Sequence, residues 1–557
     1  MNLPSAAPRA GPLNPTSSPV WGGFELPSSW KPTLKFILLA SLFGVAAIRV
    51  RLLSIPLERD EGEYAYMAQL ISQGIPPYQI ACNMKWPGTY FCYYLIVSVF
   101  GDTQAGIHLG LIVVSTATTV ALYCLAKRLA GDLVATVAAS AQALLSVSPL
   151  SLGLAGHATH FVILPALISA NILYPSRDRP LSAWRLLLGG TLIGVATLNK
   201  QAGALFALFC LYEIFLWLKE GDRWKKEFLY SSALFGLGCL IPLLSTLIYL
   251  SITGVLDRFW FWTVKYAAAY ASILSLRDGL FLLGDSVKGL FKDSPFLWSF
   301  ALGGVFVIGF DRGLRRNLFG VLFFAFCSFL AVCPGWYFRS HYFLLFFPAL
   351  GLLAGVFIMW ATRKSAAYRS LKAVPLFLFV AGAAVELYLH REVYFWASPE
   401  DVSRIVYGDN PFIESVEIGK YLAANCAPTG KIAVIGSEPQ IYFYAKRRSA
   451  TSYIYTYALM EPQPYASQMQ REMIEEIEKG APDFVVFVHV PTSWLMRESS
   501  SREIFEWFDR YRASHLDLLY LIQILDGKAV YTPSSSPEVR QLKTGIWMTV
   551  FRRKGLS

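Results

Sequence analysis

The sequence predicts an α-helical, polytopic membrane protein with about eleven transmembrane helices, followed by a C-terminal soluble α/β domain. The first observation is the composition: of 557 residues, 55% are hydrophobic and only 16% are charged, whereas soluble domains carry roughly 25% charged residues. The second is the recurrence of long apolar segments, and the third is the polar character of the chain after residue 391. This composition excludes a disordered, collagen-like or coiled-coil chain and argues against a purely cytosolic globular enzyme.

The first 33 residues are rich in proline and serine and lack an early cationic segment. We therefore expect residues 1–33 to form a flexible cytoplasmic tail before an uncleaved first span, rather than a cleaved signal peptide. A hydrocarbon layer of ~30 Å needs about 17 to 25 helical residues. Apolar segments of that length lie at 34–53, 104–126, 132–150, 228–252, 342–361 and 373–390. Shorter or polar-interrupted candidates lie at 161–175, 185–199, 202–218, 296–311 and 317–333.

Cations in the short loops predict the orientation of these helices. With the N-terminus in the cytoplasm, the inner loops carry cation clusters such as Lys127 and Arg128. The short connections on the opposite side hold only one cation, Lys200. The apolar stretch 89–100 is short for a crossing, so we expect an interfacial or re-entrant piece. The net charge of +11 then belongs to cytoplasmic loops that face anionic lipid, and we expect no nucleic-acid partner.

The chain after the last apolar segment reads as a separate domain. Strand-like runs are KIAVIG at 431–436, DFVVFVHV at 483–490 and IWMTVF at 546–551. Between them, residues 466–479 have helical periodicity. We expect residues 391–557 to form an extracytoplasmic soluble α/β domain, and residues 34–390 to form the transmembrane catalytic domain with a first outer loop at 54–103.

The first outer loop holds the densest group of ionisable residues. The carboxylates that follow the first span are Glu58, Asp60, Glu61 and Glu63. Carboxylates beside a bilayer are costly unless they are solvated or used, so they either take part in chemistry or solvate the loop and cap a helix at 61–73. Lys85 follows in a KWPG turn, whose proline stiffens the backbone. A fixed cation at this level suits a phosphate.

Two further polar clusters are expected on the outer face. In GHATHF, His157 and His160 can bind a metal, although hydrogen bonds to substrate or helix ends are the favoured interpretation. In LNKQAG, Lys200 is a functional candidate, and snorkelling to the interface explains it equally well. The segment 334–348 presents a cation, an imidazole and a phenol, namely Arg339, His341 and Tyr342. An aromatic belt with one snorkelling arginine is the alternative there.

These clusters suit transfer of a sugar from a lipid phosphate. Once its charge is neutralised, a phosphate leaves readily, so the reaction needs one carboxylate to accept the proton of the acceptor hydroxyl and no strong general acid. Glycoside hydrolysis would need two carboxylates with separate roles. The eight cysteines include no C-x-x-C pair, so neither a zinc site nor a disulfide framework is predicted.

The ordered set of motifs resembles the GT-C membrane glycosyltransferases, which include the protein O-mannosyltransferases, the lipid A aminoarabinose transferases and the RgtA-to-D-like bacterial enzymes. The resemblance covers residues 34–390 and rests on ERDEGEYAYMAQ, a G-x-PPY turn, K-x-PG, AKRLAG, LNKQAG and RSHYFLLFFPAL. It implies a GT-C fold, a polyprenyl-phosphate-linked donor, an extracytoplasmic site and inversion at the anomeric carbon. By resemblance, Asp60 matches the loop-one carboxylate that acts as base, Glu61 completes an Asp-Glu pair, and Lys85 matches the phosphate-binding lysine.

The resemblance also defines the candidate contacts. Histidines stand where oligosaccharyltransferases have an acidic D-x-D motif, so we expect no required cofactor and no metal site, with a divalent metal as a minor alternative. The candidate catalytic residues are Asp60 and Glu61. The candidate substrate contacts are Lys85, Tyr64, His157, His160, Lys200, Arg339, His341 and Tyr342.

We therefore expect an inverting glycosyltransferase of the bacterial inner membrane. It would move a sugar from a polyprenyl phosphate to a glycan, lipid or protein acceptor outside the cytoplasm, with membrane lipid around it. We also expect the early carboxylates and the later cations to meet in one outward-facing pocket. A transporter or lipid flippase with an outer cap domain is the alternative, which would predict ionisable residues at mid-membrane depth and a pseudo-repeat of the spans.

Overall fold

The structure is a computed structural model that describes residues 28–556 except 175–180, 220–222 and 369. Most of the expected tail at 1–33 lies outside the described residues. The chain divides into two compact units. The helical unit comprises Met1–Arg51, His108–Thr246 and Leu276–Trp396. The mixed unit comprises Leu52–Ile107, Leu247–Ser275 and Ala397–Ser557. The division of the sequence near residue 390 into a transmembrane and a soluble domain stays a prediction.

The helical unit contains the helices that form from the apolar segments. Its first elements are α1 (Trp30–Arg51), α4 (Gln104–Leu145), α5 (Ala158–Leu173), α6 (Ala183–Asn199), the 3₁₀ helix η1 (Gln201–Leu205), α7 (Phe206–Leu218) and α8 (Trp224–Ile252). The later ones are α11 (Leu276–Asp293), α12 (Pro295–Phe310), α13 (Arg312–Leu330), the 3₁₀ helix η3 (Ser340–Leu345), α14 (Phe347–Ser365), α15 (Val374–Leu389) and the π-helical turn η4 (Glu392–Trp396). Each of the expected apolar segments falls mainly on one of these helices.

Helix length and composition identify fewer spans than the sequence patterns predict. Among the described residues, four helical stretches are long and apolar enough to cross a membrane: α1, α4, α8 and the continuous stretch Gln201–Leu218. A fifth results if Leu256–Ala271 and Leu276–Asp293 form one broken span. Several other apolar helices have only 10–17 residues. The expected number of about eleven spans stays a prediction, because it requires these short helices to cross as well.

One long helix contains two expected spans. Within α4, Gly131 has φ 82° and ψ 179°, so the helix breaks there. A positive φ costs glycine little because it has no Cβ. The break lies between the apolar segments expected at 104–126 and 132–150, and it separates them as the sequence predicts.

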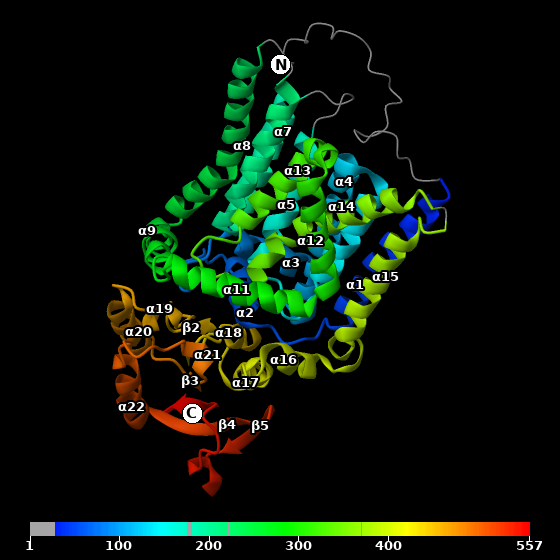
Figure 1. The fold of residues 1–557 in the computed structure, drawn as a ribbon. Coiled ribbons are helices and arrows are strands. Elements are labelled where there is room, and N and C mark those ends of the chain that lie inside the picture. The colour runs from blue at the N-terminus through cyan, green and yellow to red at the C-terminus, as the bar shows by residue number, and fades with distance from the viewer. Residues whose placement is uncertain (1–27, 175–180, 220–222, 369, 557) are drawn as a thin grey trace. The chain divides into compact units, whose positions relative to one another are not determined.

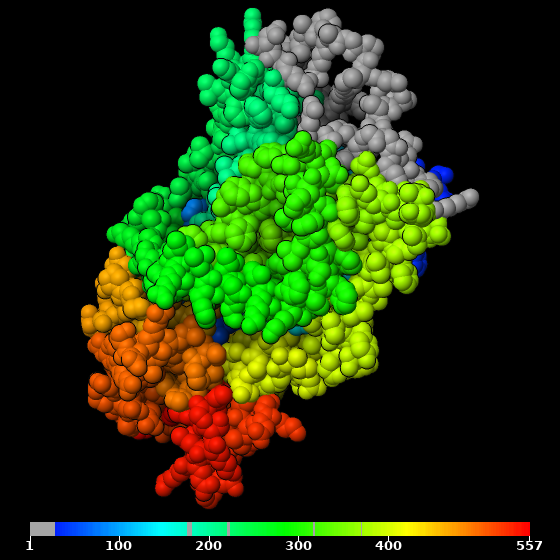
Figure 2. All heavy atoms as spheres, in the orientation of Figure 1, coloured from blue at the N-terminus to red at the C-terminus, as the bar shows by residue number. Residues whose placement is uncertain are grey.

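Close helix packing in the helical unit depends on small residues. Helices α12 and α14 lie side by side (Figure 1). A Cβ on Gly304 would lie 2.0 Å from the carbonyl oxygen of Leu353, and one on Gly351 would lie 2.4 Å from that of Ala138. Such contacts are typical of helices packed in membranes. The side chains of α11, α12 and α13 cover one face of this unit (Figure 2).

Large apolar side chains remain exposed along the outer helices. Phe36 and Phe43 on α1, Leu229 on α8, and Phe306 and Phe310 on α12 are all exposed. Exposed apolar side chains in such numbers are typical of surfaces that contact lipid or another apolar partner. Each of the eight cysteines lies in the described ranges and is a free thiol, so none of them closes a disulfide.

The C-terminal part of the mixed unit is built on a six-stranded mixed sheet in the order β2-β1-β3-β6-β4-β5. Its strands are β1 (Lys431–Ile435), β2 (Arg448–Ser449), β3 (Phe484–His489), β4 (Leu516–Leu525), β5 (Lys528–Pro533) and β6 (Trp547–Arg553). β1 pairs in parallel with β2 and β3, whereas the other pairs are antiparallel. The three expected strand runs form β1, β3 and β6. The sequence analysis missed β4 and β5.

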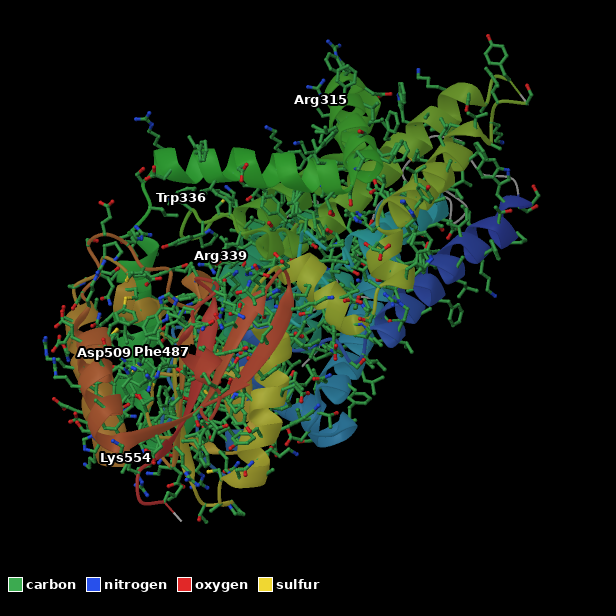
Figure 3. All side chains as sticks on the ribbon, turned by 90° about the horizontal axis from the view of Figure 1, so that it is seen from below. Arg315, Trp336, Arg339, Phe487, Asp509 and Lys554 are labelled. Carbon is green, nitrogen blue, oxygen red and sulfur yellow. The ribbon has the colours of Figure 1, made fainter. Side chains whose placement is uncertain are left out.

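Helices cover this sheet. They are α16 (Pro399–Tyr407), α17 (Phe412–Asn425), α18 (Gln440–Ala445), α19 (Tyr457–Met460), α20 (Ala466–Gly480), α21 (Pro491–Trp494), α22 (Glu503–His515) and the 3₁₀ helix η5 (Pro537–Arg540). On β3, Phe487 stacks on Phe508 of α22 with ring centroids 4.5 Å apart, while the neighbouring Asp509 is exposed (Figure 3). The helix expected at 466–479 is α20.

The segment 54–103, the expected first outer loop, belongs to the mixed unit. It forms α2 (Arg59–Ser72) and α3 (Gly88–Phe100), and the unit also contains α9 (Leu256–Trp260), the π-helical turn η2 (Phe261–Tyr266) and α10 (Ala267–Ala271). Helix α3 has 13 residues, too few to span a bilayer. Helix α2 packs directly on α18, because a Cβ on Gly62 would lie 2.5 Å from Cβ of Gln440. Tyr66 stacks on Tyr442 at 5.1 Å beside this contact.

Candidate active site

At the start of helix α2, the four clustered carboxylates of the expected outer loop make different contacts. Glu58 is the N-cap, and its Oε1 accepts a hydrogen bond of 2.9 Å from the Glu61 N–H. The Glu61 Oε2 accepts a bond of 3.4 Å from the Glu58 N–H, which completes a capping box. Both side chains are buried. Glu58 and Glu61 therefore cap the helix, as one of the two interpretations of these carboxylates expects, whereas Asp60 takes no part in the capping box.

Asp60 forms an ion pair with Lys85. The Lys85 Nζ lies 2.5 Å from the Asp60 Oδ1, and the two side chains are 21% and 19% exposed. The same Nζ lies 4.7 Å from the ring centroid of Tyr64, within cation–π distance. The structure thus brings together three of the predicted site residues, and the partial exposure leaves the pair accessible.

A second carboxylate, that of Glu63, completes this group. Glu63 lies one helical turn after Asp60, so both side chains project from the same face of α2. Its Oε2 lies 3.0 Å from the Lys85 Nζ and accepts a 2.6 Å bond from Asn83, while its Oε1 accepts a 2.6 Å bond from the Tyr90 hydroxyl. Complete burial raises the pKa of Glu63. Glu63 is therefore a structural carboxylate that holds Lys85 in place.

The charge state of Lys85 follows from these partners. Burial lowers the pKa of Lys85, but the negative charges of Asp60 and Glu63 outweigh it and raise the pKa well above its ordinary value. The ammonium group is therefore protonated throughout the physiological range. It provides a fixed positive charge rather than a proton donor.

Arg59, the residue before Asp60, is anchored by residues from the C-terminal part of the chain. Its Nε donates to the Ser437 carbonyl at 2.6 Å and its Nη2 lies 2.8 Å from the Glu438 Oε1. Its Nη1 donates to the Tyr457 hydroxyl at 2.9 Å. The sequence analysis assigns no role to Arg59. Its partners lie almost 400 positions away, so no local pattern indicates them.

The helical unit holds a second cluster of predicted site residues. His157, the N-cap of α5, stacks on His341 with ring centroids 4.3 Å apart. Tyr342 meets His341 edge-on at 4.8 Å, and the Lys200 Nζ lies 3.2 Å from the centroid of the Tyr342 ring. Residues from three segments that lie far apart in the sequence are therefore neighbours. This cluster presents one cation, two imidazoles and one phenol.

The remaining two predicted residues lie beside this cluster in the chain. His160 is buried in the first turn of α5, where its N–H donates to the carbonyl of His157 at 3.0 Å. Arg339 precedes η3, and its guanidinium carbon lies 5.5 Å from the ring centroid of Tyr337. Arg339 and Trp336 are labelled in Figure 3.

The backbone before Arg339 is strained. Trp336 and Phe338 have φ values of 61° and 43°, in the left-handed region that bulky residues rarely adopt. Strain of this kind costs of order 1–3 kcal/mol per residue and clusters at functional sites. The sequence carries no signal for it apart from Gly335, whose φ is 80°.

Neither unit by itself presents a complete metal site. Within either unit, the described residues include no group of three His, Cys, Asp or Glu side chains with ligand atoms close together. In the helical unit, His157 and His341 supply two imidazoles, whereas catalytic zinc sites use three protein ligands. The expected absence of a metal stays a prediction.

Comparisons with known proteins bear directly on the fold. Residues 85–246 match the family described as dolichyl-phosphate-mannose-protein mannosyltransferase. The structure is similar to that of ArnT from Cupriavidus metallidurans bound to undecaprenyl phosphate, with a TM-score of 0.54 and 15% identity over 94% of this chain and 98% of that chain. The chain has the GT-C fold. No curated protein sequence matched it.

A second solved structure has the same fold. The Archaeoglobus fulgidus oligosaccharyltransferase, in complex with Zn and sulfate, has a TM-score of 0.52 and 12% identity, over 89% of this chain and 73% of that chain. Both solved structures confirm that the chain has the expected GT-C fold. With its apolar helices, the chain is a multi-pass membrane protein.

Proposed function

We propose that this GT-C protein is an inverting glycosyltransferase that moves a sugar from a polyprenyl phosphate to an acceptor on the extracytoplasmic side of a bacterial inner membrane. The observation that carries the proposal is the partly exposed ion pair between Asp60 and Lys85. It is supported by the fold, by the match of residues 85–246 to a family named for a dolichyl-phosphate-mannose donor, and by the undecaprenyl phosphate of the ArnT structure. The acceptor is a glycan, a lipid or a protein.

In the proposed reaction, Asp60 is the general base. The acceptor oxygen attacks the anomeric carbon while the bond from that carbon to the phosphate oxygen breaks. The acceptor hydroxyl proton passes to the Asp60 carboxylate, and the polyprenyl phosphate leaves with the bonding electron pair. One displacement of this kind inverts the anomeric centre. A positioned base contributes typically 10²- to 10⁴-fold to such a step.

Lys85 is the proposed contact to the donor phosphate in the mixed unit. Its permanent charge stabilises the phosphate as negative charge develops on the leaving oxygen. Asp60 and Glu63 already face this ammonium group. Lys85 alone therefore does not neutralise the two negative charges of the polyprenyl phosphate that leaves. We therefore also propose Lys200 and Arg339 as donor contacts contributed by the helical unit, with Tyr342, His341, His157 and His160 as further substrate contacts.

Glu61 has no separate reactive role in this proposal, because its carboxylate belongs to the helix cap. Tyr64 acts through its ring, which supports the Lys85 ammonium group. We propose that no cofactor or metal is required, since fixed cations take the place of a metal at the phosphate. Treatment with a chelator should leave transfer unchanged, whereas a loss restored by added Mn²⁺ or Mg²⁺ would contradict this.

The test is a transfer assay with the purified full chain in lipid nanodiscs. Radiolabelled polyprenyl-phosphate sugars and a mixture of envelope glycans, lipids and proteins are supplied as substrates. The proposal predicts release of polyprenyl phosphate and a labelled product whose anomeric configuration, read by NMR, is opposite to that of the donor. A transporter or flippase would return the donor chemically unchanged, which would contradict the proposal.

A further inference from the structure

The carboxylate proposed as the base receives a second hydrogen bond, from the C-terminal part of the chain. The Tyr455 hydroxyl donates to the Asp60 Oδ1 at 3.0 Å. The same oxygen accepts the 2.5 Å bond from the Lys85 Nζ. Two donors from segments that are far apart in the sequence therefore converge on one oxygen of Asp60, and this fixes the direction of its side chain.

Tyr455 also contacts the lysine of this pair. The Lys85 Nζ lies 5.4 Å from the centroid of the Tyr455 ring and 4.7 Å from that of the Tyr64 ring. Both distances are within cation–π range. Lys85 is thus held by two carboxylates and two aromatic rings, and one of the rings comes from the C-terminal segment.

The segment that carries Tyr455 is fixed on both sides. Before it, the Ser452 N–H donates to the Glu476 Oε2 at 2.6 Å. After it, the Thr456 N–H donates to the Ser437 hydroxyl at 2.9 Å, and the Thr456 hydroxyl donates to the Ser493 carbonyl at 3.0 Å. These anchors lie on different elements around the sheet. Tyr455 therefore reaches Asp60 from a preorganised loop, which is what a supporting residue of a precise site requires.

The phenol of Tyr455 is a hydrogen-bond donor at all physiological pH values. Burial raises the pKa of Tyr455 well above its ordinary value, and the nearby negative charge of Asp60 adds to this. The hydroxyl proton therefore stays in place and points at the carboxylate oxygen. A proton acceptor held in this way keeps one geometry for attack, and misplacement by even about 1 Å can cost 10²-fold in rate.

We propose that Tyr455 is a positioning residue for Asp60, so that the C-terminal segment 397–557 completes the active site. This inference rests on the proposed glycosyltransferase function. In this proposal the C-terminal residues are part of the reaction centre, and not only a surface that holds the acceptor. Arg59 supports the same arrangement, since its buried pair with Glu438 fixes the backbone next to Asp60.

The test compares Tyr455→Phe with a matched control, Tyr453→Phe, in the full chain. Tyr453 lies two residues earlier in the same segment, and its hydroxyl bonds the carboxylate of Glu472 instead of Asp60. Each variant loses one phenol–carboxylate bond, so the stability losses should be similar. Both retain their rings, and Tyr455→Phe therefore keeps the aromatic face next to Lys85.

We expect Tyr455→Phe to lower kcat about 10- to 100-fold at saturating donor and acceptor, the rate equivalent of a lost hydrogen bond to a charged group. The donor KM should change less than about twofold, because the phosphate contact through Lys85 persists. Tyr453→Phe should leave both constants within about twofold of the wild type. Thermal midpoints of both variants, measured in parallel, report their folding.

Three outcomes would overturn the proposal. If Tyr455→Phe has the wild-type kcat, the hydroxyl does not position the base. If both variants lose kcat in proportion to their thermal midpoints, the effect is structural. If the wild type itself releases no polyprenyl phosphate, the proposed function fails and the role of Tyr455 fails with it. This outcome is distinguishable because the wild type is assayed before any variant.

Discussion

Arg59 and Glu438 form an ion pair of 2.8 Å across 379 positions of the sequence. The side chains are 9% and 0% exposed, and Arg59 is the residue directly before Asp60. The rest of the guanidinium is hydrogen-bonded to Ser437 and Tyr457. This pair joins the first turn of α2 to the loop after β1, so the proposed base is placed by residues from two of the three segments of the mixed unit.

Glu438→Gln should strongly destabilise the protein. Removing one partner of a buried ion pair leaves the other charge uncompensated, which costs about 3–5 kcal/mol. We expect a large drop in the thermal midpoint of the purified chain in detergent. The double variant Arg59→Met/Glu438→Met should recover part of the loss, because neither charge is then buried alone. A single variant as stable as the wild type would show that the pair contributes nothing.

Asp60→Asn should reduce transfer by about 10² to 10⁴, since an amide cannot accept the acceptor proton. The side chains have nearly the same size, so expression and the thermal midpoint should change little. Asp509→Asn, an exposed exchange of the same type on α22, serves as the control and should keep wild-type activity. Full activity of Asp60→Asn would remove the carboxylate mechanism.

Lys85→Ala should raise the donor KM more than the acceptor KM. A charged hydrogen bond to phosphate corresponds to about a 10- to 100-fold effect, and the acceptor makes no such contact in this account. A two-substrate titration separates the two constants, with Lys554→Ala, a change at an exposed lysine, as the control. Equal changes in both constants would argue against a phosphate role for Lys85.

Glu63→Gln should change how stability depends on pH. Burial raises the pKa of Glu63 in the folded protein above its ordinary value of 4.5, so the folded state binds this proton more tightly than the unfolded chain. The contribution of Glu63 to stability is therefore largest at low pH and is lost as pH rises through the folded pKa. The neutral amide does not titrate.

The thermal midpoint of Glu63→Gln, relative to the wild type, should accordingly increase as the pH is raised from about 4.5. Glu417→Gln removes an exposed carboxylate of the same unit and should show no such trend. A difference between Glu63→Gln and wild type that stays constant with pH would mean that Glu63 titrates normally.

Much of the helical architecture follows from apolar segment length alone. The break between 104–126 and 132–150 falls at Gly131, and the short apolar stretch 89–100 forms the short helix α3. The leucine-rich strand β4 was missed because a run such as LDLLYLIQIL fits a helix or a strand equally well. Pairing with β5 on one side and β6 on the other makes this segment a strand. Such pairing cannot be recognised from one segment alone.

The candidate site was predictable only in part. Asp60, Lys85 and Tyr64, which lie together in the structure, were predicted from one loop with several ionisable residues. Glu58/Glu61 and Asp60/Glu63 have the same spacing of three residues, so only the start of α2 at Arg59 identifies Glu58 and Glu61 as the capping box. Tyr455 gave no signal, since its role depends on a contact across 395 positions.

The most direct test of the central claim is an experimental structure of the full chain in nanodiscs with bound polyprenyl phosphate. The account predicts that the phosphate lies within ion-pair distance, about 4 Å, of the Lys85 Nζ, on the side of that residue where Asp60 and Tyr455 meet. Lys200 and Arg339 should approach the same phosphate. A phosphate bound elsewhere, or Lys200 and Arg339 on the opposite side of the bilayer from Asp60, would contradict the account.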